Sequence, residues 1–186
     1  MASGSRSRRI AIWTLGGILA LYVCLIGVKV LWPLRFEDEV RTAAAAQRLD
    51  LDLVLAVIYA ESRFDPEAVS YVGAVGLMQI MPETGRWIAE QIPLAHSEAI
   101  DLFKPALNVR LGTWYLRYLL DRFSDVETAL AAYNAGPTRV DRWLAENRAP
   151  FAETAAFVRR VLAARHVYRV YMSLSGLLRY VPSLTF

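Results

Sequence analysis

The sequence predicts an all-α domain preceded by one N-terminal transmembrane helix. Residues 10–28 form an uncharged run of 19 residues, which is long enough as a helix to cross the hydrocarbon core of a membrane. The rest of the chain places apolar residues at helical spacing and shows no strand-like alternation. Proline and glycine separate these helical segments. The part after the run has about 150 residues, enough for a core of its own.

Charged and aromatic residues flank the uncharged run as they do in membrane helices. Three arginines precede it, and Lys29 and Trp32 follow it, where they can reach the interface. Basic residues are enriched on the cytoplasmic side of membrane helices. We therefore expect residues 1–9 in the cytoplasm, residues 10–32 as a signal anchor in the inner membrane, and the domain at 36–180 on the periplasmic side.

The run is expected to stay uncleaved. No small-x-small cleavage pattern follows it, and it is long for the core of a signal peptide. Cys24 is preceded by Val23, where a lipoprotein signal would have a small residue. A cleaved signal peptide is the alternative, and the gel mobility of the exported form would distinguish the two.

The formal net charge of +3 comes from the N-terminal region. Residues 1–35 hold five Lys or Arg and no acid, whereas the remainder holds 16 basic and 18 acidic residues. Because nucleic-acid binding needs basic charge gathered on the folded domain, we expect no nucleic-acid partner. The single cysteine lies inside the apolar run, so the exported domain has no disulfide.

The helices can be placed in order after the boundary at Pro33. Asp50 and Asp52 are plausible N-caps of a central helix that is apolar on nearly all sides. The segment after Arg63 loses helical periodicity and should form an ordered loop. The predicted helices cover residues 40–49, 51–62, 82–88, 107–123, 126–135, 139–146 and 150–174.

Glu61 stands at the end of the apolar stretch LVLAVIYAES. A carboxylic acid in such a place loses solvation of its ionised form, which raises its pKa. It can then stay protonated near neutral pH and donate a proton to a leaving group. The alternative is a structural glutamate at a helix end, paired with Arg63 or with a nearby cap.

Two further stretches carry polar groups beside glycines. GAVGLMQIMPETG combines a flexible backbone with Met78 and Gln79, whose side chains can approach a bound sugar. AYNAGP presents Tyr133 and Asn134 before a glycine turn. Each stretch alone is also common in turns and at helix ends that have only a structural role.

In this order, the ES, GLMQ and AYNAG motifs resemble those of the SLT-type lytic transglycosylases of bacteria, a goose-type lysozyme-like family. The resemblance covers roughly residues 38–172 and implies a lysozyme-like fold. It implies cleavage of the β-1,4 bond between N-acetylmuramic acid and N-acetylglucosamine in peptidoglycan strands, without cofactor or metal. It also implies a single catalytic acid/base and a set of groove residues. These are Glu61 as the acid/base, Ser62 as its polar neighbour, Met78 and Gln79 in the groove loop, and Tyr133 and Asn134 beside the cleavage point.

The sequence offers no obvious buried second carboxylate, so one acid would have to serve twice. Glu61 would protonate the glycosidic oxygen and, as a carboxylate, then deprotonate the C6 hydroxyl of the same sugar. That hydroxyl closes on C1 and gives a 1,6-anhydro product. Hydrolysis by water, as in a muramidase, is an alternative on the same fold. His96 and His166 are far apart without other ligands at metal-binding spacing, so no metal site is expected.

One departure from the family concerns Phe157. The ETxxYV segment of the family usually carries a tyrosine whose hydroxyl lies near the catalytic acid, and ETAAFV has Phe157 there. This residue favours a further alternative, a non-catalytic glycan-binding scaffold of a cell-wall machine. Three tryptophans, Trp87, Trp114 and Trp143, could stack on sugars, but their helical spacing is more typical of core residues. The sequence does not indicate protein partners.

Overall fold

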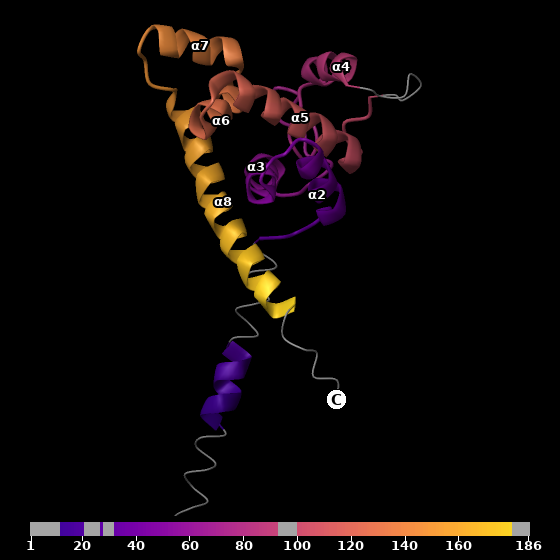
Figure 1. The fold of residues 1–186 in the computed structure, drawn as a ribbon, viewed down its shortest axis with the longest axis vertical. Helices are drawn as coiled ribbons and strands as arrows, with labels where there is room; N and C mark the ends of the chain where they lie inside the picture. Colours follow the sequence, from indigo (N-terminus) through magenta and orange to yellow (C-terminus); the bar gives the residue numbers. More distant parts are fainter. Residues whose placement is uncertain (1–11, 21–26, 28–31, 93–99, 180–186) are drawn as a thin grey trace, which may run out of the picture. The chain divides into compact units, whose positions relative to one another are not determined.

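The computed structural model describes residues 12–20, 27, 32–92 and 100–179, and it divides the chain into two units, residues 1–35 and 36–186 (Figure 1). In the first unit, residues 12–20 are helical with exposed side chains. Most of the predicted anchor at 10–32 lies outside the described residues. Of the helices in the described ranges, none combines the length and hydrophobicity that a bilayer-spanning segment requires.

The second unit is helical, which confirms the predicted all-α class. In the described part of the chain, extended pairing occurs only as isolated bridges, from Val75 to Val69 and from Val75 to Ile80. The predicted helices are all present with bounds shifted by a few residues. They are α2 (Glu37–Ala46), α3 (Leu51–Ser62), α4 (Pro82–Gln91), α5 (Pro105–Phe123), α6 (Val126–Ala135), α7 (Pro137–Ala145) and α8 (Ala152–Arg179).

The central helix is α3, as its apolar sequence predicts. Residues 53–58 are all buried, with at most 3% of each side chain exposed. The helix packs against α2 and α8, and Figure 1 shows α8 running past it as the longest helix of the unit. Removing so much apolar surface from water is the main force that holds the helices around α3.

The predicted capping role of Asp50 and Asp52 is wrong. Asp50 occupies the N-cap position of α3, but its side chain caps no backbone N–H. The Asp50 carboxylate accepts a 2.7 Å hydrogen bond from Arg165 of α8, and the buried Asp52 carboxylate accepts from Arg165 at 3.2 Å and Arg169 at 2.7 Å. The two acids therefore attach the start of α3 to α8, because two guanidinium groups compete successfully for their oxygens.

Candidate active site

Glu61 lies in the last turn of α3, where the buried helix reaches the surface. Its side chain is partly exposed and lines a cavity of about 570 Å³. Burial raises the pKa of the Glu61 carboxyl to about 8, although the positive charge of Arg160 opposes this effect. Glu61 therefore carries a proton at neutral pH and faces a space that a ligand can enter.

Five parts of the domain enclose this cavity together with Glu61. The loop after α3 provides residues 70–72, 74 and 79–81, and α4 and α5 provide Thr84 and Tyr115. The junction of α6 and α7 and the start of α8 complete the wall. The chain thus brings the GLMQ loop and the AYNAG turn to one cavity with Glu61, although they lie far apart in the sequence.

Ser62 ties this end of α3 to the GLMQ loop. Its hydroxyl lies 2.8 Å from the carbonyl oxygen of Leu77 and 3.3 Å from that of Ile58, and it does not line the cavity. Because a hydroxyl has one proton, the shorter contact to Leu77 is the main hydrogen bond. Ser62 therefore positions the loop beside Glu61 and does not face a ligand.

The predicted position of Met78 in the groove is corrected by the structure. Its side chain is fully buried, against Gly112 of α5. A Cβ atom at Gly112 would overlap the Met78 side chain, so only glycine allows this contact. The thioether lies in the core because the loop turns its apolar residue inward, and Met81 takes the exposed place.

Asn108 of α5 holds the same loop and was missed by the sequence analysis. It is fully buried, and its side-chain oxygen accepts a 2.7 Å hydrogen bond from the backbone N–H of Met78. Its amide nitrogen donates to the carbonyl oxygens of Val75 and Leu102, both at 2.8 Å. Each part of the buried amide is therefore satisfied, as a buried polar side chain requires.

Gln79 lines the cavity with its backbone in the left-handed region, at φ 48°. Its side-chain nitrogen donates to the carbonyl oxygens of Ala68 at 3.1 Å and Gly76 at 2.9 Å. These two bonds use both protons of the amide nitrogen. The Gln79 oxygen is the part of the amide that is left to accept a hydrogen bond from a ligand.

Tyr133 and Asn134, at the end of α6, both line the cavity. The Tyr133 hydroxyl donates a 2.9 Å hydrogen bond to the carbonyl oxygen of Met78. Burial, reinforced by the charges of Glu61 and Tyr115, raises the pKa of Tyr133 well above its ordinary value, so the phenol stays a donor. Asn134 is exposed to the cavity and free to face a ligand.

The structure adds several residues to the site. Met81 lines the cavity with 38% of its surface exposed, and Tyr115 lies beside Tyr133 with ring centroids 5.4 Å apart. Glu153 and Thr154, at the start of α8, also line it. The second methionine of GLMQIM and the ET pair before Phe157 are the sequence signals that could have identified these residues.

Glu153 supplies a second carboxylate on the cavity wall, and it is exposed. Three acids that follow Glu61 closely in the sequence, Asp65, Glu67 and Glu83, do not line this cavity. Within the described ranges, no three His, Cys, Asp or Glu side chains are grouped so that they could hold a metal ion. His166 lies in these ranges, whereas His96 lies outside them.

Phe157 is buried in α8 with 1% of its surface exposed. The guanidinium carbon of Arg160 lies 5.8 Å from the centre of its ring, a cation–π arrangement. Arg160 is itself exposed and its charge acts on Glu61. Arg160, which lies against the Phe157 ring, therefore lowers the pKa of Glu61. This chain has no tyrosine hydroxyl at position 157.

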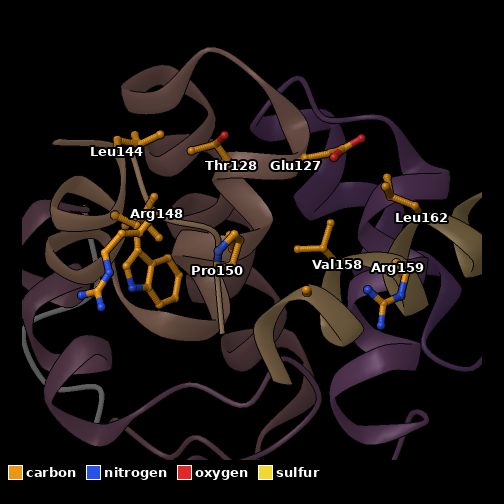
Figure 2. Close-up of a pocket in the computed structure, with 12 residues that line it drawn as sticks. Glu127, Thr128, Leu144, Arg148, Pro150, Val158, Arg159 and Leu162 are labelled. Carbon is orange, nitrogen blue, oxygen red and sulfur yellow. The ribbon is translucent and has the colours of Figure 1, made fainter. Parts of the chain in front are cut away.

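A second cavity, of about 410 Å³, lies between α6, α7 and α8 (Figure 2). Its lining is mainly apolar and includes Leu144, Pro150 and Val158, with Arg148 and Arg159 on opposite sides in the view of Figure 2. None of the candidate site residues lines it. Glu127 is the carboxylate on this lining, whereas Glu61 faces the other cavity.

Comparison with known proteins places this geometry in a family. Residues 38–155 match the model of the Transglycosylase SLT domain, which covers more than half of the chain. The chain belongs to the SLT transglycosylase domain family. The matched range begins in α2 and ends in the first turn of α8, so it contains Glu61 and every other predicted site residue.

Relatives of the SLT domain extend the match beyond that range. The soluble lytic murein transglycosylase of Escherichia coli is 33% identical over 154 residues, which cover 76% of this chain and 24% of the relative. The chain therefore spans about a quarter of the length of that relative.

Two solved structures share the fold of the SLT domain. An inactive mutant of lytic transglycosylase Slt from Pseudomonas aeruginosa has a TM-score of 0.71 at 32% identity, and covers 78% of this chain and 26% of its own. The 70 kDa soluble lytic transglycosylase of Escherichia coli has a TM-score of 0.68 at 35% identity, with 76% and 25% covered. The predicted lysozyme-like all-α SLT fold is confirmed.

Proposed function

We propose that the chain is a lytic transglycosylase that cleaves peptidoglycan with Glu61 as its single acid/base. The observation that carries the proposal is a partly buried carboxyl, with a pKa of about 8, facing a cavity lined by the two other motifs of the family. The similarity to a protein named a soluble lytic murein transglycosylase supports murein as the substrate.

The first step uses the proton that burial keeps on Glu61. The carboxylic acid donates it to the glycosidic oxygen between N-acetylmuramic acid and N-acetylglucosamine, and the C1–O bond breaks. Positive charge then develops at C1 of the muramoyl residue, where its own acetamido group can stabilise it. The raised pKa of Glu61 makes this donation possible at neutral pH.

The second step uses the carboxylate that the first step leaves. Glu61 takes the proton of the C6 hydroxyl, and the C6 oxygen bonds to C1, which gives the 1,6-anhydromuramoyl end and restores the acid. Ser62 and Tyr133 hold the loop that borders this space through Leu77 and Met78. Asn134 and the Gln79 oxygen are positioned to bind the sugar.

Hydrolysis by water is the second candidate, and Glu153 is the observation that favours it. In an inverting glycosidase a second carboxylate activates the water that attacks C1. Glu153 lines the cavity but is exposed, whereas Glu61 is largely surrounded by protein. The anhydro route needs only Glu61, and we therefore favour it.

A non-catalytic scaffold is the third candidate, based on Phe157. A glycan-binding module has no need of a buried acid with a raised pKa, which argues against this role. Changing Phe157→Tyr would restore the hydroxyl of the family, and a shift in the pH–rate profile would show that the position acts on Glu61. An unchanged profile would remove Phe157 from the mechanism.

We also propose that the protein acts at the periplasmic face of the inner membrane, anchored by its N-terminal segment. The support is the uncharged run at residues 10–28 together with the arginines before it. Fractionation of cells and protease access from the periplasmic side would test this location. Protection of the domain in intact spheroplasts would contradict it.

The activity is tested with the full chain in detergent and purified peptidoglycan. Mass spectrometry of the released muropeptides should show 1,6-anhydro ends for the wild type and none for Glu61→Gln. Reducing ends in place of anhydro ends, lost in Glu153→Gln, would establish a muramidase. Binding of peptidoglycan without release of products by the wild type would establish the scaffold.

A further inference from the structure

Four aromatic side chains form a continuous strip on α4 and α5. We call Trp87, Trp114, Tyr115 and Tyr118 the aromatic strip. Trp87 lies edge-on to Trp114 and Tyr118, with ring centroids 5.5 Å and 5.2 Å apart. Trp114 and Tyr118 are stacked at 5.8 Å with their planes 4° apart. These contacts hold the rings in one arrangement before any ligand binds.

The aromatic strip continues the wall of the Glu61 cavity. Tyr115 belongs to both, since it lines the cavity and its ring contacts that of Tyr118 at 6.3 Å. Thr84 of α4 lines the cavity as well, and Trp87 follows it one turn later on the same helix. Thr84 and Trp87 therefore lie on one face of α4, and Tyr115 and Tyr118 lie on one face of α5. Both faces extend from the cavity to the aromatic strip.

The side chains of the strip are not core residues. Trp87 is 37% exposed, and the other three are partly exposed. Their neighbours Ile88 and Leu116 are fully buried, so the helices turn their aliphatic residues inward and these rings outward. The expectation that Trp87 and Trp114 belong to the core is therefore wrong, while Trp143 is buried at 6% as expected.

We propose that the aromatic strip is a further glycan-binding subsite, which holds sugar rings of the strand beyond those in the Glu61 cavity. This proposal rests on the proposed function for the identity of the polymer. A cavity of about 570 Å³ encloses a ligand of limited size, whereas a glycan strand is a polymer whose remaining sugars must lie on the adjoining surface. The strip adjoins the cavity through Tyr115.

The chemistry of the strip suits a sugar. A pyranose ring presents apolar C–H faces, which stack on indole and phenol rings, and polar hydroxyls at its edge. The edge of the strip is polar, because Arg122 donates a 3.3 Å hydrogen bond to the Tyr118 hydroxyl and pairs with Asp141 of α7 at 2.5 Å. A stacked sugar would thus find hydrogen-bonding groups beside its hydroxyls.

The test uses the full chain in detergent with Glu61→Gln, so that the ligand is not cleaved. Calorimetry measures the affinities for the disaccharide and the hexasaccharide of N-acetylglucosamine. Adding Trp87→Ala should weaken hexasaccharide binding by about tenfold, or about 1.4 kcal/mol, and leave disaccharide binding unchanged. Trp87→Phe should retain most of the affinity. Phe103→Ala removes an aromatic side chain of similar exposure outside the strip and serves as the control.

The outcomes separate this proposal from the proposed function. If Trp87→Ala weakens both ligands equally, or neither, or if the parent binds no hexasaccharide, the subsite does not exist. Thermal unfolding checks that each variant is folded, and Trp87→Phe preserves the test should Trp87→Ala unfold. Suppose that hexasaccharide binding depends on Trp87 but the wild-type protein releases no product from peptidoglycan. This result would support the subsite and refute the transglycosylase activity. Product formation with no length dependence would do the reverse.

Discussion

The phenolic hydroxyl of Tyr133 donates a 2.9 Å hydrogen bond to the backbone carbonyl oxygen of Met78. The bond joins the AYNAG turn to the GLMQ loop across 55 positions of the chain. Asn108 bonds to the N–H of the same Met78, and Ser62 to the carbonyl oxygen of Leu77 before it. Three separate helices, α3, α5 and α6, therefore hold the GLMQ loop in place close to Glu61.

Removing the Tyr133 hydroxyl should lower stability. Tyr133→Phe leaves the buried carbonyl of Met78 without its donor, which costs about 1–3 kcal/mol of unfolding free energy. Urea denaturation measures the loss. Tyr71→Phe is the matched control, because Tyr71 is 94% exposed and its change should stay within about 0.5 kcal/mol. Equal stability of the two variants would show that the hydrogen bond contributes nothing.

Activity should fall as the pH rises through about 8. The pKa of Glu61 is raised to about 8 by burial, and the acid must be protonated to donate its proton. The rate of product release from peptidoglycan, measured from pH 5 to pH 10, should therefore have its alkaline limb near that value. An alkaline limb near pH 5 would contradict the raised pKa of Glu61.

Glu61 should also destabilise the fold at neutral pH. The carboxyl has a pKa of about 8 in the folded chain, against 4.5 for an unperturbed glutamate, so only the unfolded chain releases its proton between these values. Stability is thus full below pH 4.5 and decreases as the pH rises toward 8. Glu61→Gln should raise the unfolding free energy at pH 7 by on the order of 1–3 kcal/mol and change it little at pH 4.

The control for that effect is Glu90→Gln, since Glu90 is exposed on α4. Glu90→Gln should leave the difference in unfolding free energy between pH 4 and pH 7 the same as in the wild type. If Glu61→Gln shows the same pH dependence as the wild type, the carboxyl is not held neutral in the fold.

Arg160 should set the position of the alkaline limb. Its positive charge favours the ionised form of Glu61 and lowers its pKa, against the larger effect of burial. Arg160→Gln should therefore move the limb to higher pH, and the pH–rate profile measures this shift. Arg159→Gln removes the neighbouring arginine, which lines the other cavity (Figure 2), and should leave the limb in place. Equal profiles for both variants would contradict this role of Arg160.

Asp52 should contribute strongly to stability. Its buried carboxylate accepts hydrogen bonds from Arg165 and Arg169, and Asp52→Ala would remove both of these charge-assisted bonds and leave Arg165 with Asp50 alone, at a cost of about 3 kcal/mol. Denaturation by urea measures the change. Asp121→Ala breaks the exposed pair with Arg117 and should cost less than about 1 kcal/mol. A loss at Asp52 no greater than at Asp121 would show that the α3–α8 attachment is not needed.

The sequence alone was sufficient for the helices and for the family. The apolar stretch before Glu61 predicted a buried central helix, and Pro82 and Gly136 marked helix ends that the structure confirms. These features depend on residues close together in the chain, through periodicity and backbone preference. The order of the three motifs predicted the SLT family through their resemblance to its known motifs, before any contact between them was known.

Only the tertiary structure decided which side chains of the loop face the cavity. Gln79 adopts a left-handed backbone conformation, and this turn sends Met78 into the core and Met81 toward the cavity, with no periodicity to signal it. Long-range partners likewise drew Asp52 to α8 and Asn108 to the loop. Local sequence specifies where helices form, but the direction of a loop side chain depends on the hydrogen bonds and the space that distant residues provide.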